Sequence, residues 1–367
     1  MNRRRNGAPG RRPRVAIVVN ADGLQVRRAE AFRCHLEPEF AIDVVVAPGT
    51  RALRRVGGGD AVYVIDPGRR GFPAAIAAWL ARSAVVVEVG DPQGALYRVL
   101  GRGTGAVAAG AAIDRLVARH ADALVVRGRG LADVLRPRVP WAEIPDGVDV
   151  DLFRPGVDGD VRSKLGIPAN AFVVGLAGSL AWAPGAGIGY GWDVVECLAQ
   201  VRDETVWGLV VGDGEGRSRL RERADELGVG RRLVLPGHVP HEDVPRYLCA
   251  MDVCVSTQTN DPVGHGRTTA KLPEYLACDR FVLATRVGAA AEVLPPGMLL
   301  PYEGQADRNH PARLARRVAE LLPRRAELRR GAGTRAIAVE RYAYPLLALR
   351  LAALVRRVLS GRGRRDG

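Results

Sequence analysis

The strongest constraint on the fold of this chain is a repeated alternation of short apolar runs with longer segments of helical pattern. Each run is four to six residues long and rich in valine, and helices are expected between the runs at 27–36, 73–81 and 106–120. Apolar runs of this length that alternate with helices are typical of strands buried on both faces of a parallel sheet. The first part of the chain is therefore expected to be a doubly wound α/β domain. Its runs are VAIVV (15–19), IDVVV (42–46), AVYVI (61–65), AVVVEV (84–89) and ALVV (123–126).

The alternation stops over 140–155, where proline, glycine and aspartate follow one another closely, and then begins again. Such a stretch is typical of a linker, and a chain of 367 residues has the length for two domains. We therefore predict two Rossmann-like domains, at about 14–152 and 157–338, with a last amphipathic helix over 344–359 that packs back on the first domain. The carboxyl ends of their strands would face one another across a cleft. The second set of runs is FVVGLAG (172–178), WGLVVG (207–212), RLVLPG (232–237), DVCVS (252–256) and RFVLAT (280–285), with helices expected at 193–202, 218–227, 243–250 and 272–277.

The net charge of +14 is concentrated at the two ends of the chain. Residues 1–14 carry six arginines and no acid, and residues 350–367 carry six arginines against Asp366, so the ends hold 11 of the 14 net positive charges. Segments of this composition, at 1–12 and 360–367, are expected to be disordered, solvated tails. They favour at most a weak contact with an anionic membrane surface or with RNA. The nearly neutral body does not indicate specific nucleic-acid binding.

Cysteine usage and apolar run lengths bear on the cellular compartment. The five cysteines are scattered without a CxxC pair, which favours buried free thiols in a reducing compartment. The apolar run after the basic start ends at Val19, and no stretch reaches the length of a membrane span, so neither a signal peptide nor a span is expected. We therefore expect a cytoplasmic protein, at most peripheral at the inner membrane face. The histidine and cysteine spacing fits no zinc pattern.

Four segments in the second half follow one another in the order and spacing of a known family. They are IPDGVDVDLFRP (144–155), LVVGDGEGRSRLRERADEL (209–227), LVLPGHVPHEDVPRYLCAMDVCVS (233–256) and AKLPEYLACDRFVLATRVGAAAEVL (270–294). They resemble the family-four GT-B glycosyltransferases, of the group 1 type with a KLxEY donor helix. The resemblance is strong over 144–294 and weaker at VEVGDPQG (87–94) and RHADALVV (119–126). It implies the GT-B fold, a nucleotide-sugar donor in the C-terminal domain and an acceptor in the N-terminal domain.

The donor helix supplies the first group of expected site residues. A helix opening at Thr268–Lys271 would present free backbone N–H groups and a positive dipole end to a diphosphate. Thr268, Thr269, Arg267 and Lys271 are therefore expected at the diphosphate, with the two cations neutralising the leaving group. Lys271 is one of only two lysines in the chain, the other being Lys164. Glu274 matches the family glutamate that accepts hydrogen bonds from the ribose hydroxyls.

Loops after strands supply the second group. The resemblance implies that the backbone of 237–239 contacts the nucleobase, and the glycine-rich loop at 178–179 can cradle phosphate through its amides. Asp91 is the best-placed polar side chain near the reacting sugar, and a turn or helix cap is its alternative role. The residues of this group are Gly237, His238, Val239, Gly178, Ser179, Asp91 and, where backbone could approach the phosphates from the opposite wall, Gly23.

The chain also departs from the family pattern. The loop 178–193 contains no basic residue, although the family normally has one there to bind the diphosphate. Gly266 stands where many members have a first glutamate, and no acceptor-side histidine is evident, since His120 ends a helix. Asp149 and Asp151 have the spacing of a metal motif but lie in the linker, so no metal or other cofactor is expected. Gly212, Gly214 and Gly216 imitate only part of a dinucleotide fingerprint.

The resemblance predicts a retaining, metal-independent transferase that uses a UDP-, GDP- or dTDP-sugar. Its acceptor could be a glycan, a lipid-linked or a small molecule, in cell-envelope glycan, exopolysaccharide or natural-product biosynthesis. Catalysis would rest on positioning and on stabilising the departing diphosphate. A catalytically degenerate GT-B partner of an active transferase is the alternative that the missing loop cation favours. A nucleotide-sugar epimerase fits the KLxEY region less well.

Overall fold

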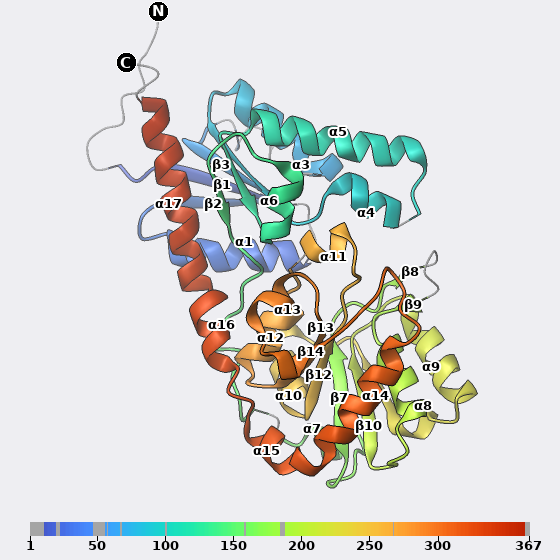
Figure 1. Ribbon diagram of the computed structural model, residues 1–367. Coiled ribbons are helices and arrows are strands. Elements are labelled where there is room, and N and C mark those ends of the chain that lie inside the picture. The colour runs from blue at the N-terminus through green and yellow to red at the C-terminus, as the bar shows by residue number, and fades with distance from the viewer. Residues whose placement is uncertain are drawn as a thin grey trace, which may run out of the picture. The chain divides into compact units, whose positions relative to one another are not determined.

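The computed structural model describes residues 11–19, 23–46, 56, 58–66, 68–99, 101–157, 159–183, 188–266 and 268–363. The chain divides into two compact units. The first comprises Met1–Gln93, Ala108–Ile144 and Tyr344–Gly367, and the second comprises Gly94–Val107 and Pro145–Ala343. Each unit is built around one six-stranded parallel sheet (Figure 1).

The sheet of the first unit has the strand order β2-β1-β3-β4-β5-β6, and all of its neighbouring strands are parallel. Four of its strands are buried along nearly their whole length, which explains why their sequences read as continuous apolar runs. The strands are β1 (Arg14–Val19), β2 (Ala41–Val46), β3 (Ala61–Ile65), β4 (Ala84–Val89), β5 (Ala123–Val126) and β6 (Trp141–Glu143). Along the chain these strands alternate with helices α1 (Gly23–Leu36), α3 (Gly68–Leu80), α4 (Gln93–Val99), α5 (Thr104–His120) and α6 (Arg129–Leu135), of which residues 94–107 are counted with the second unit. Helix α17 (Tyr344–Gly363) completes the first unit.

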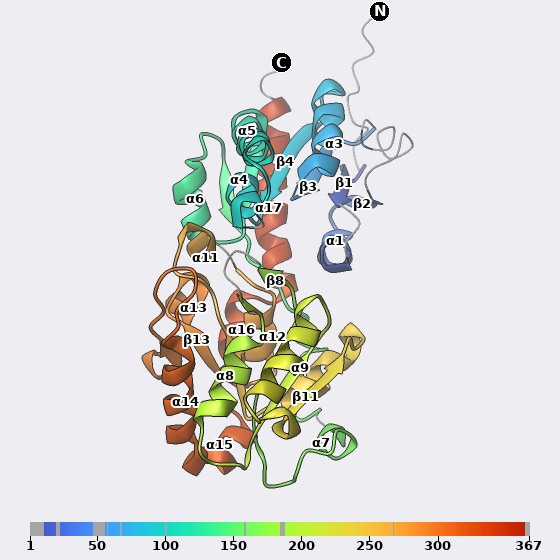
Figure 2. The same cartoon turned by 90° about the vertical axis from the view of Figure 1, so that its right-hand side faces the viewer.

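Helices cover both faces of this first sheet (Figure 2). On one face, α1 and α17 pack through Phe32, Leu36 and Leu351 against strand residues such as Ile17. On the other face, α3, α5 and α6 form a separate apolar cluster. The C-terminal helix thus belongs to the core of the first unit, although it follows the second unit in sequence.

The sheet of the second unit has the order β11-β10-β7-β12-β13-β14 and is also parallel. Helices α8, α9 and α14 lie on one side of it and α10, α12 and α16 on the other (Figures 1 and 2). The strands are β7 (Phe172–Ala177), β10 (Val206–Val211), β11 (Leu233–Gly237), β12 (Val253–Ser256), β13 (Phe281–Thr285) and β14 (Leu299–Leu300), and a separate hairpin pairs β8 (Trp182–Ala183) with β9 (Ile188–Gly189). The helices are α7 (Val161–Lys164), α8 (Trp192–Gln200), α9 (Gly216–Glu226), α10 (Val244–Cys249), α11 (Pro262–Gly266), α12 (Lys271–Ala277), α13 (Gly288–Val293), α14 (His310–Leu321), α15 (Arg325–Arg330) and α16 (Arg335–Arg341).

The prediction of two Rossmann-like halves is confirmed, and three details of the sequence analysis are corrected. The segment 140–155, expected as a linker, begins with the short edge strand β6, whose half-exposed residues do not form an apolar run. Residues 360–363, expected as tail, continue α17 to Gly363, and Arg11 and Arg12 contact Asp60 and the backbone of Glu37. The remainder of the predicted tails, 1–10 and 364–367, lies outside the described residues.

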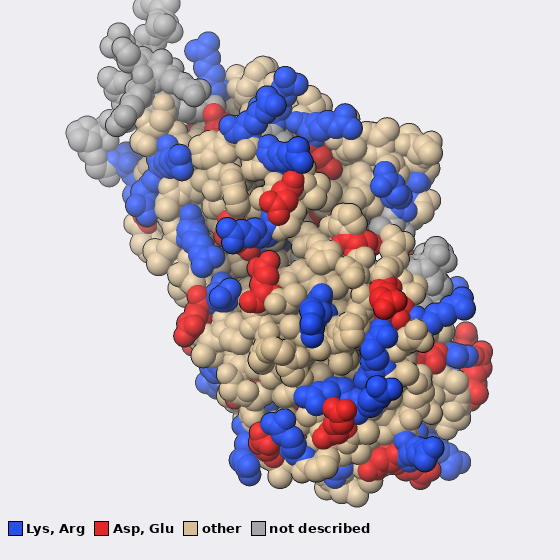
Figure 3. Space-filling model, viewed as in Figure 1, with Lys and Arg blue, Asp and Glu red and all other residues tan. Residues whose placement is uncertain are grey.

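Three further features of the described residues concern membranes, surface charge and cysteines. No helix among them is both long enough and apolar enough to pass through a lipid bilayer. On the face seen in Figure 3, lysine and arginine side chains are interspersed with acidic ones, without one continuous basic patch. Four of the five cysteines are buried as free thiols, and Cys34 is exposed.

Candidate functional site

The strand order of the second sheet determines where a ligand would be expected. The chain first adds β10 and β11 on one side of β7 and then returns to add β12 and β13 on the other. In doubly wound sheets, ligands bind outside the carboxyl ends of the strands at the point where the order reverses. This position, which we call the reversal point, lies between the carboxyl ends of β7 and β12. Gly178 and Ser179 follow β7, and Thr257 follows β12.

The loops that follow β7, β10 and β11 are tied together by backbone hydrogen bonds. The amide of Gly178 donates to the carbonyl of Val211 (2.9 Å), and the amide of Gly212 donates to the carbonyl of Gly237 (2.9 Å). Gly212 has a φ of 136°, and a Cβ there would lie 1.9 Å from the carbonyl oxygen of Gly178. The glycines that imitate a dinucleotide fingerprint therefore allow this close approach of two loops.

The side chain of Lys271 packs against Gly178, at the end of β7. Gly178 has a φ of 149°, and a Cβ there would lie 2.4 Å from Cε of Lys271. The ammonium of Lys271 lies 3.3 Å from the centroid of the Tyr190 ring, a cation–π contact. A cation from α12 thus reaches the loop 178–193, which has no basic residue of its own.

The start of the donor helix differs from the sequence prediction. Helix α12 begins at Lys271, so Thr268 and Thr269 precede the helix and do not open it. The buried Thr268 hydroxyl donates to a carboxylate oxygen of Asp146 (3.2 Å) and accepts from its amide (3.3 Å). This pairing with the 144–147 segment explains why the helix starts later. Arg267, expected at the diphosphate, lies outside the described residues.

The other predicted donor residues lie on elements at the same edge of the sheet. Glu274 is half-buried and lies three positions after Lys271 on α12. Gly237 ends β11 with a φ of 88°, His238 is exposed and Val239 packs on the core. Within the loop 237–239, backbone rather than the His238 ring is therefore held in a fixed position. Ser179 is exposed beside Gly178.

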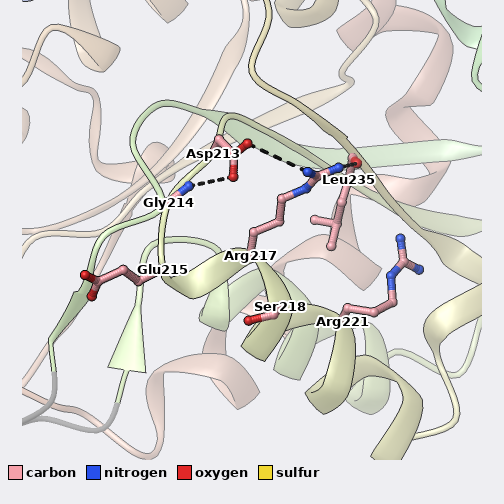
Figure 4. Close-up of a pocket in the computed structure, with 7 residues that line it drawn as sticks. All are labelled: Asp213, Gly214, Glu215, Arg217, Ser218, Arg221 and Leu235. Carbon is pink, nitrogen blue, oxygen red and sulfur yellow. Dashed lines mark hydrogen bonds and ion pairs between the residues drawn. The ribbon is translucent and has the colours of Figure 1, made fainter.

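A pocket of about 440 Å³ lies against α9 and the end of β11 (Figure 4). Its Arg217 donates to the carbonyl of Leu235 (3.1 Å) and pairs with Asp213 (3.7 Å). A Cβ on Gly237 would lie 3.2 Å from this guanidinium, so Arg217 supports the backbone of the 237–239 loop. No sequence pattern predicts a role for Arg217, because its contact with Leu235 joins two segments that are far apart in sequence. The pocket is lined by Asp213, Gly214, Glu215, Arg217, Ser218, Arg221 and Leu235.

The first unit contains a buried charged cluster that the sequence analysis missed. Glu88 on β4 accepts from Arg28 of α1 (3.0 Å), from Arg127 after β5 (2.7 Å) and from the Tyr63 hydroxyl. Arg127 also pairs with Asp66 after β3. The available signal was the single charge, Glu88, within the otherwise apolar strand AVVVEV. We call Asp66, Glu88, Arg127, Arg28 and Tyr63 the β4 charge cluster.

The two predicted site residues of the first unit follow its strands. Asp91 lies just after β4 and is partly exposed, close enough to raise the pKa of Asp66. Gly23 is exposed at the first position of α1. Burial is the largest cause that raises the pKa of Asp66, to about 6, and Arg127 opposes it.

The metal-like aspartate pair has a structural role. One carboxylate oxygen of Asp149 accepts from the amides of Asp151 (2.9 Å) and Leu152 (3.0 Å), which closes a turn. Within the described part of the chain, no group of three or more histidine, cysteine or acidic side chains is placed to hold a metal ion.

Comparisons with known proteins agree with this arrangement. Residues 171–324 match the family model described as "Glycosyl transferases group 1". A 2-deoxystreptamine N-acetyl-D-glucosaminyltransferase of Streptomyces fradiae is 31% identical over 201 residues, which are 52% of this chain and 43% of that protein. A 2-deoxystreptamine glucosyltransferase of Streptomyces kanamyceticus is 28% identical over 60% of this chain and 57% of that protein. The chain thus spans about half the length of these curated relatives.

Solved structures show a likeness in fold over nearly the whole chain. Sucrose-phosphate synthase from Thermosynechococcus elongatus superposes with a TM-score of 0.72 at 17% identity, covering 95% of this chain and all 100% of that one. Anabaena HepE, solved in complex with UDP-glucose, gives a TM-score of 0.71 at 18% identity, over 94% of this chain and 100% of that one. Residues 171–324 thus resemble the group 1 glycosyltransferases, and the two Rossmann-like units have the GT-B fold.

Proposed function

We propose that this protein transfers a sugar from a nucleotide-diphosphate sugar to an acceptor, with retention of the anomeric configuration. The observation that carries the proposal is the Lys271 ammonium, held across Gly178 at the reversal point of the second sheet. The family match over 171–324 and the UDP-glucose complex of Anabaena HepE support a nucleotide-sugar donor. Retention rests on the resemblance over 144–294.

Different residues of the second unit bind the donor and stabilise the diphosphate as the glycosidic bond breaks. Negative charge accumulates on the diphosphate as it leaves, and a cation fixed in advance stabilises that charge more than it stabilises the intact donor. Lys271 supplies the cation, and Tyr190 restricts its movement. Arg267, which adjoins the donor helix in sequence, supplements it, whereas the Gly178 amide already donates to the carbonyl of Val211. Glu274 binds the ribose hydroxyls, and the backbone of 237–239 contacts the base.

The donor nucleotide is identified by a thermal-shift screen against UDP, GDP, ADP and dTDP. A ligand at 100 times its dissociation constant adds about 2.7 kcal/mol to the free energy of unfolding. We expect one nucleotide to raise the melting temperature clearly above the others. If none of the four does so, the proposed donor site is wrong.

Glu274→Gln is expected to weaken binding of that nucleotide by roughly 10- to 150-fold, because hydrogen bonds to charged groups contribute about 1.5–3 kcal/mol. The substitution preserves size and removes the negative acceptor. A 2′,3′-dideoxy nucleotide, which lacks the hydroxyls, should show a much smaller difference between the two proteins. Isothermal calorimetry measures both. Equal losses for the two nucleotides would place the ribose elsewhere.

Turnover is expected to proceed in EDTA, because Lys271 and Arg267 neutralise the diphosphate where other transferases use a divalent ion. The measurement is nucleotide release from the donor with EDTA and with added Mg²⁺ or Mn²⁺. Complete loss in EDTA that Mn²⁺ restores would contradict metal independence. The same assay tests the degenerate-partner alternative, since a chain that binds the donor without releasing nucleotide under any condition would favour it.

We propose natural-product decoration as the biological setting. The 2-deoxystreptamine transferases among the relatives favour natural-product decoration over cell-envelope glycan or exopolysaccharide synthesis. A cytoplasmic location is consistent with a donor made there and with the buried free thiols. Arginines at the two ends of the chain could add a weak contact with an anionic membrane.

A further inference from the structure

The reversal point of the first sheet lies between β1 and β3, because β2 was added on one side and β4 to β6 on the other. A ligand of the first unit is therefore expected outside the carboxyl ends of these two strands. Asp66 directly follows β3 at this point and has a φ of 44°. A non-glycine residue in the left-handed region is uncommon, and such strain concentrates at functional sites.

The carboxylate of Asp66 is fixed in place by three separate elements. One oxygen accepts from the amide of Gly90 (2.6 Å), after β4. The other accepts from Arg127, after β5, and from the side-chain amide of Gln25 on α1 (3.4 Å). The Asp66 side chain is still 16% exposed, whereas that of Glu88 is fully buried. Asp66 is thus the member of the β4 charge cluster that combines a fixed carboxylate with access to the surface.

Arg127 holds the carboxylate of Asp66 in place through an ion pair. A Cβ on Gly90 would lie 2.6 Å from Cζ of Arg127, so the guanidinium fills the space that a side chain at Gly90 would occupy. Arg127 is only 10% exposed and its charge is shared between Asp66 and Glu88. It is therefore poorly placed to bind an anion itself. Asp91, next to Gly90, adds a second carboxylate to the same loop.

We propose that Asp66 binds the acceptor through a hydroxyl or ammonium group, with Arg127 as its positioning residue. An ionised carboxylate only accepts hydrogen bonds, so it favours donors such as hydroxyl and ammonium groups and disfavours a phosphate. The acceptor is accordingly an amino- or hydroxyl-bearing molecule that presents no phosphate at this position. This inference rests on the proposed transferase function and specifies its acceptor class.

The charged surroundings of Asp66 predict how acceptor binding depends on pH. Burial raises the pKa of Asp66 to about 6, Arg127 lowers it, and Glu88 and Asp91 raise it. Arg28 and Tyr63, which complete the charged surroundings, both donate to Glu88. Asp66 becomes protonated, and loses its charge, as the pH falls through about 6. Affinity for an ammonium-bearing acceptor is therefore expected to fall over the same range.

The test is calorimetric titration of the full chain, in the presence of UDP, with 2-deoxystreptamine, myo-inositol and inositol 3-phosphate. We expect 2-deoxystreptamine to bind most tightly, and Asp66→Asn to weaken it by roughly 10- to 150-fold while leaving UDP binding unchanged. Asparagine tolerates the left-handed region, so the backbone at this position is retained. The decline in affinity between pH 7.5 and pH 5 should be present in the parent protein and absent in Asp66→Asn.

Asp60→Asn is the matched control, because Asp60 lies just before β3, at the opposite end of the same strand, and is exposed. It should bind every probe like the parent protein, and thermal unfolding verifies that both variants fold. Equal binding by Asp66→Asn and the parent, preference for inositol 3-phosphate, or binding of UDP with none of the three probes would each overturn the acceptor proposal. Acceptor binding without any binding of UDP or another nucleotide would instead overturn the donor proposal and leave the Asp66 site standing.

Discussion

Replacement of Lys271 by alanine is expected to lower kcat by roughly 10²- to 10³-fold, the loss typical of removing one preorganised charge-stabilising group. Its ammonium lies at the reversal point of the second sheet, against Gly178 and over the Tyr190 ring. Because the diphosphate gains charge as it leaves, the dissociation constant of the intact donor should change far less than kcat. Steady-state kinetics and donor calorimetry measure the two effects separately.

The matched control for this variant is Lys164→Ala, because Lys164 is the only other lysine in the chain. Lys164 is 67% exposed and pairs with Asp160 (2.9 Å) on the surface, so its loss should leave both kcat and donor affinity unchanged. If Lys271→Ala weakened donor binding as much as it lowered turnover, Lys271 would hold the donor without favouring its cleavage. An unchanged kcat would remove Lys271 from the mechanism.

The order of strands and helices could be predicted from the sequence, because strands that are buried on both faces consist of continuous apolar runs. Strand β4 is buried at every position, and its run AVVVEV was read directly as a strand. Strands β6 and β14 were missed, since three and two residues at a sheet edge make no such run. The β8–β9 hairpin was missed for the same reason, within a loop read only as glycine-rich.

Whether a functional residue could be predicted from the sequence depends on whether a local motif or a contact between distant segments identifies it. Lys271 and Glu274 were found because the local pattern KLPEY resembles a family motif. The start of their helix was misplaced because it depends on the pairing of Thr268 with Asp146, which lie far apart in sequence. The packing of Lys271 on Gly178 and Tyr190 is equally non-local, and no periodicity predicts it.

The β4 charge cluster shows the same limit more clearly. Its members come from β3, β4, the segments after β3 and β5, and α1, and all except Glu88 are of a type that is common in their own segments. Only Glu88 carried a usable signal, because a lone carboxylate in a fully buried strand requires a buried partner. The sequence could indicate that a partner existed, but the topology of the sheet was needed to identify Arg28 and Arg127.

Glu88→Gln is expected to lower the free energy of unfolding of the first unit by about 3–5 kcal/mol, the usual cost of removing one partner from a buried ion pair. Arg28 is 2% exposed and would lose its ion pair with Glu88, while Arg127 would lose one carboxylate partner and keep its ion pair with Asp66. Peptide-resolved hydrogen exchange in increasing denaturant measures the two units separately. Peptides of the second unit should retain the protection of the parent protein.

The dependence of this effect on pH follows from the surroundings of Glu88. Burial raises the pKa of Glu88, but Arg28, Arg127 and the Tyr63 hydroxyl together outweigh burial and hold it below its ordinary value. A lowered pKa in the folded state stabilises the unit at neutral pH, and this contribution disappears as acid protonates the carboxylate. The parent protein and Glu88→Gln should therefore converge in stability at low pH. The control, Glu37→Gln, removes an exposed partner of Arg33 and should change stability by no more than about 0.5 kcal/mol. An effect of Glu88→Gln as small as this control would mean that the cluster, and with it the fixed position of Asp66, does not depend on the buried carboxylate.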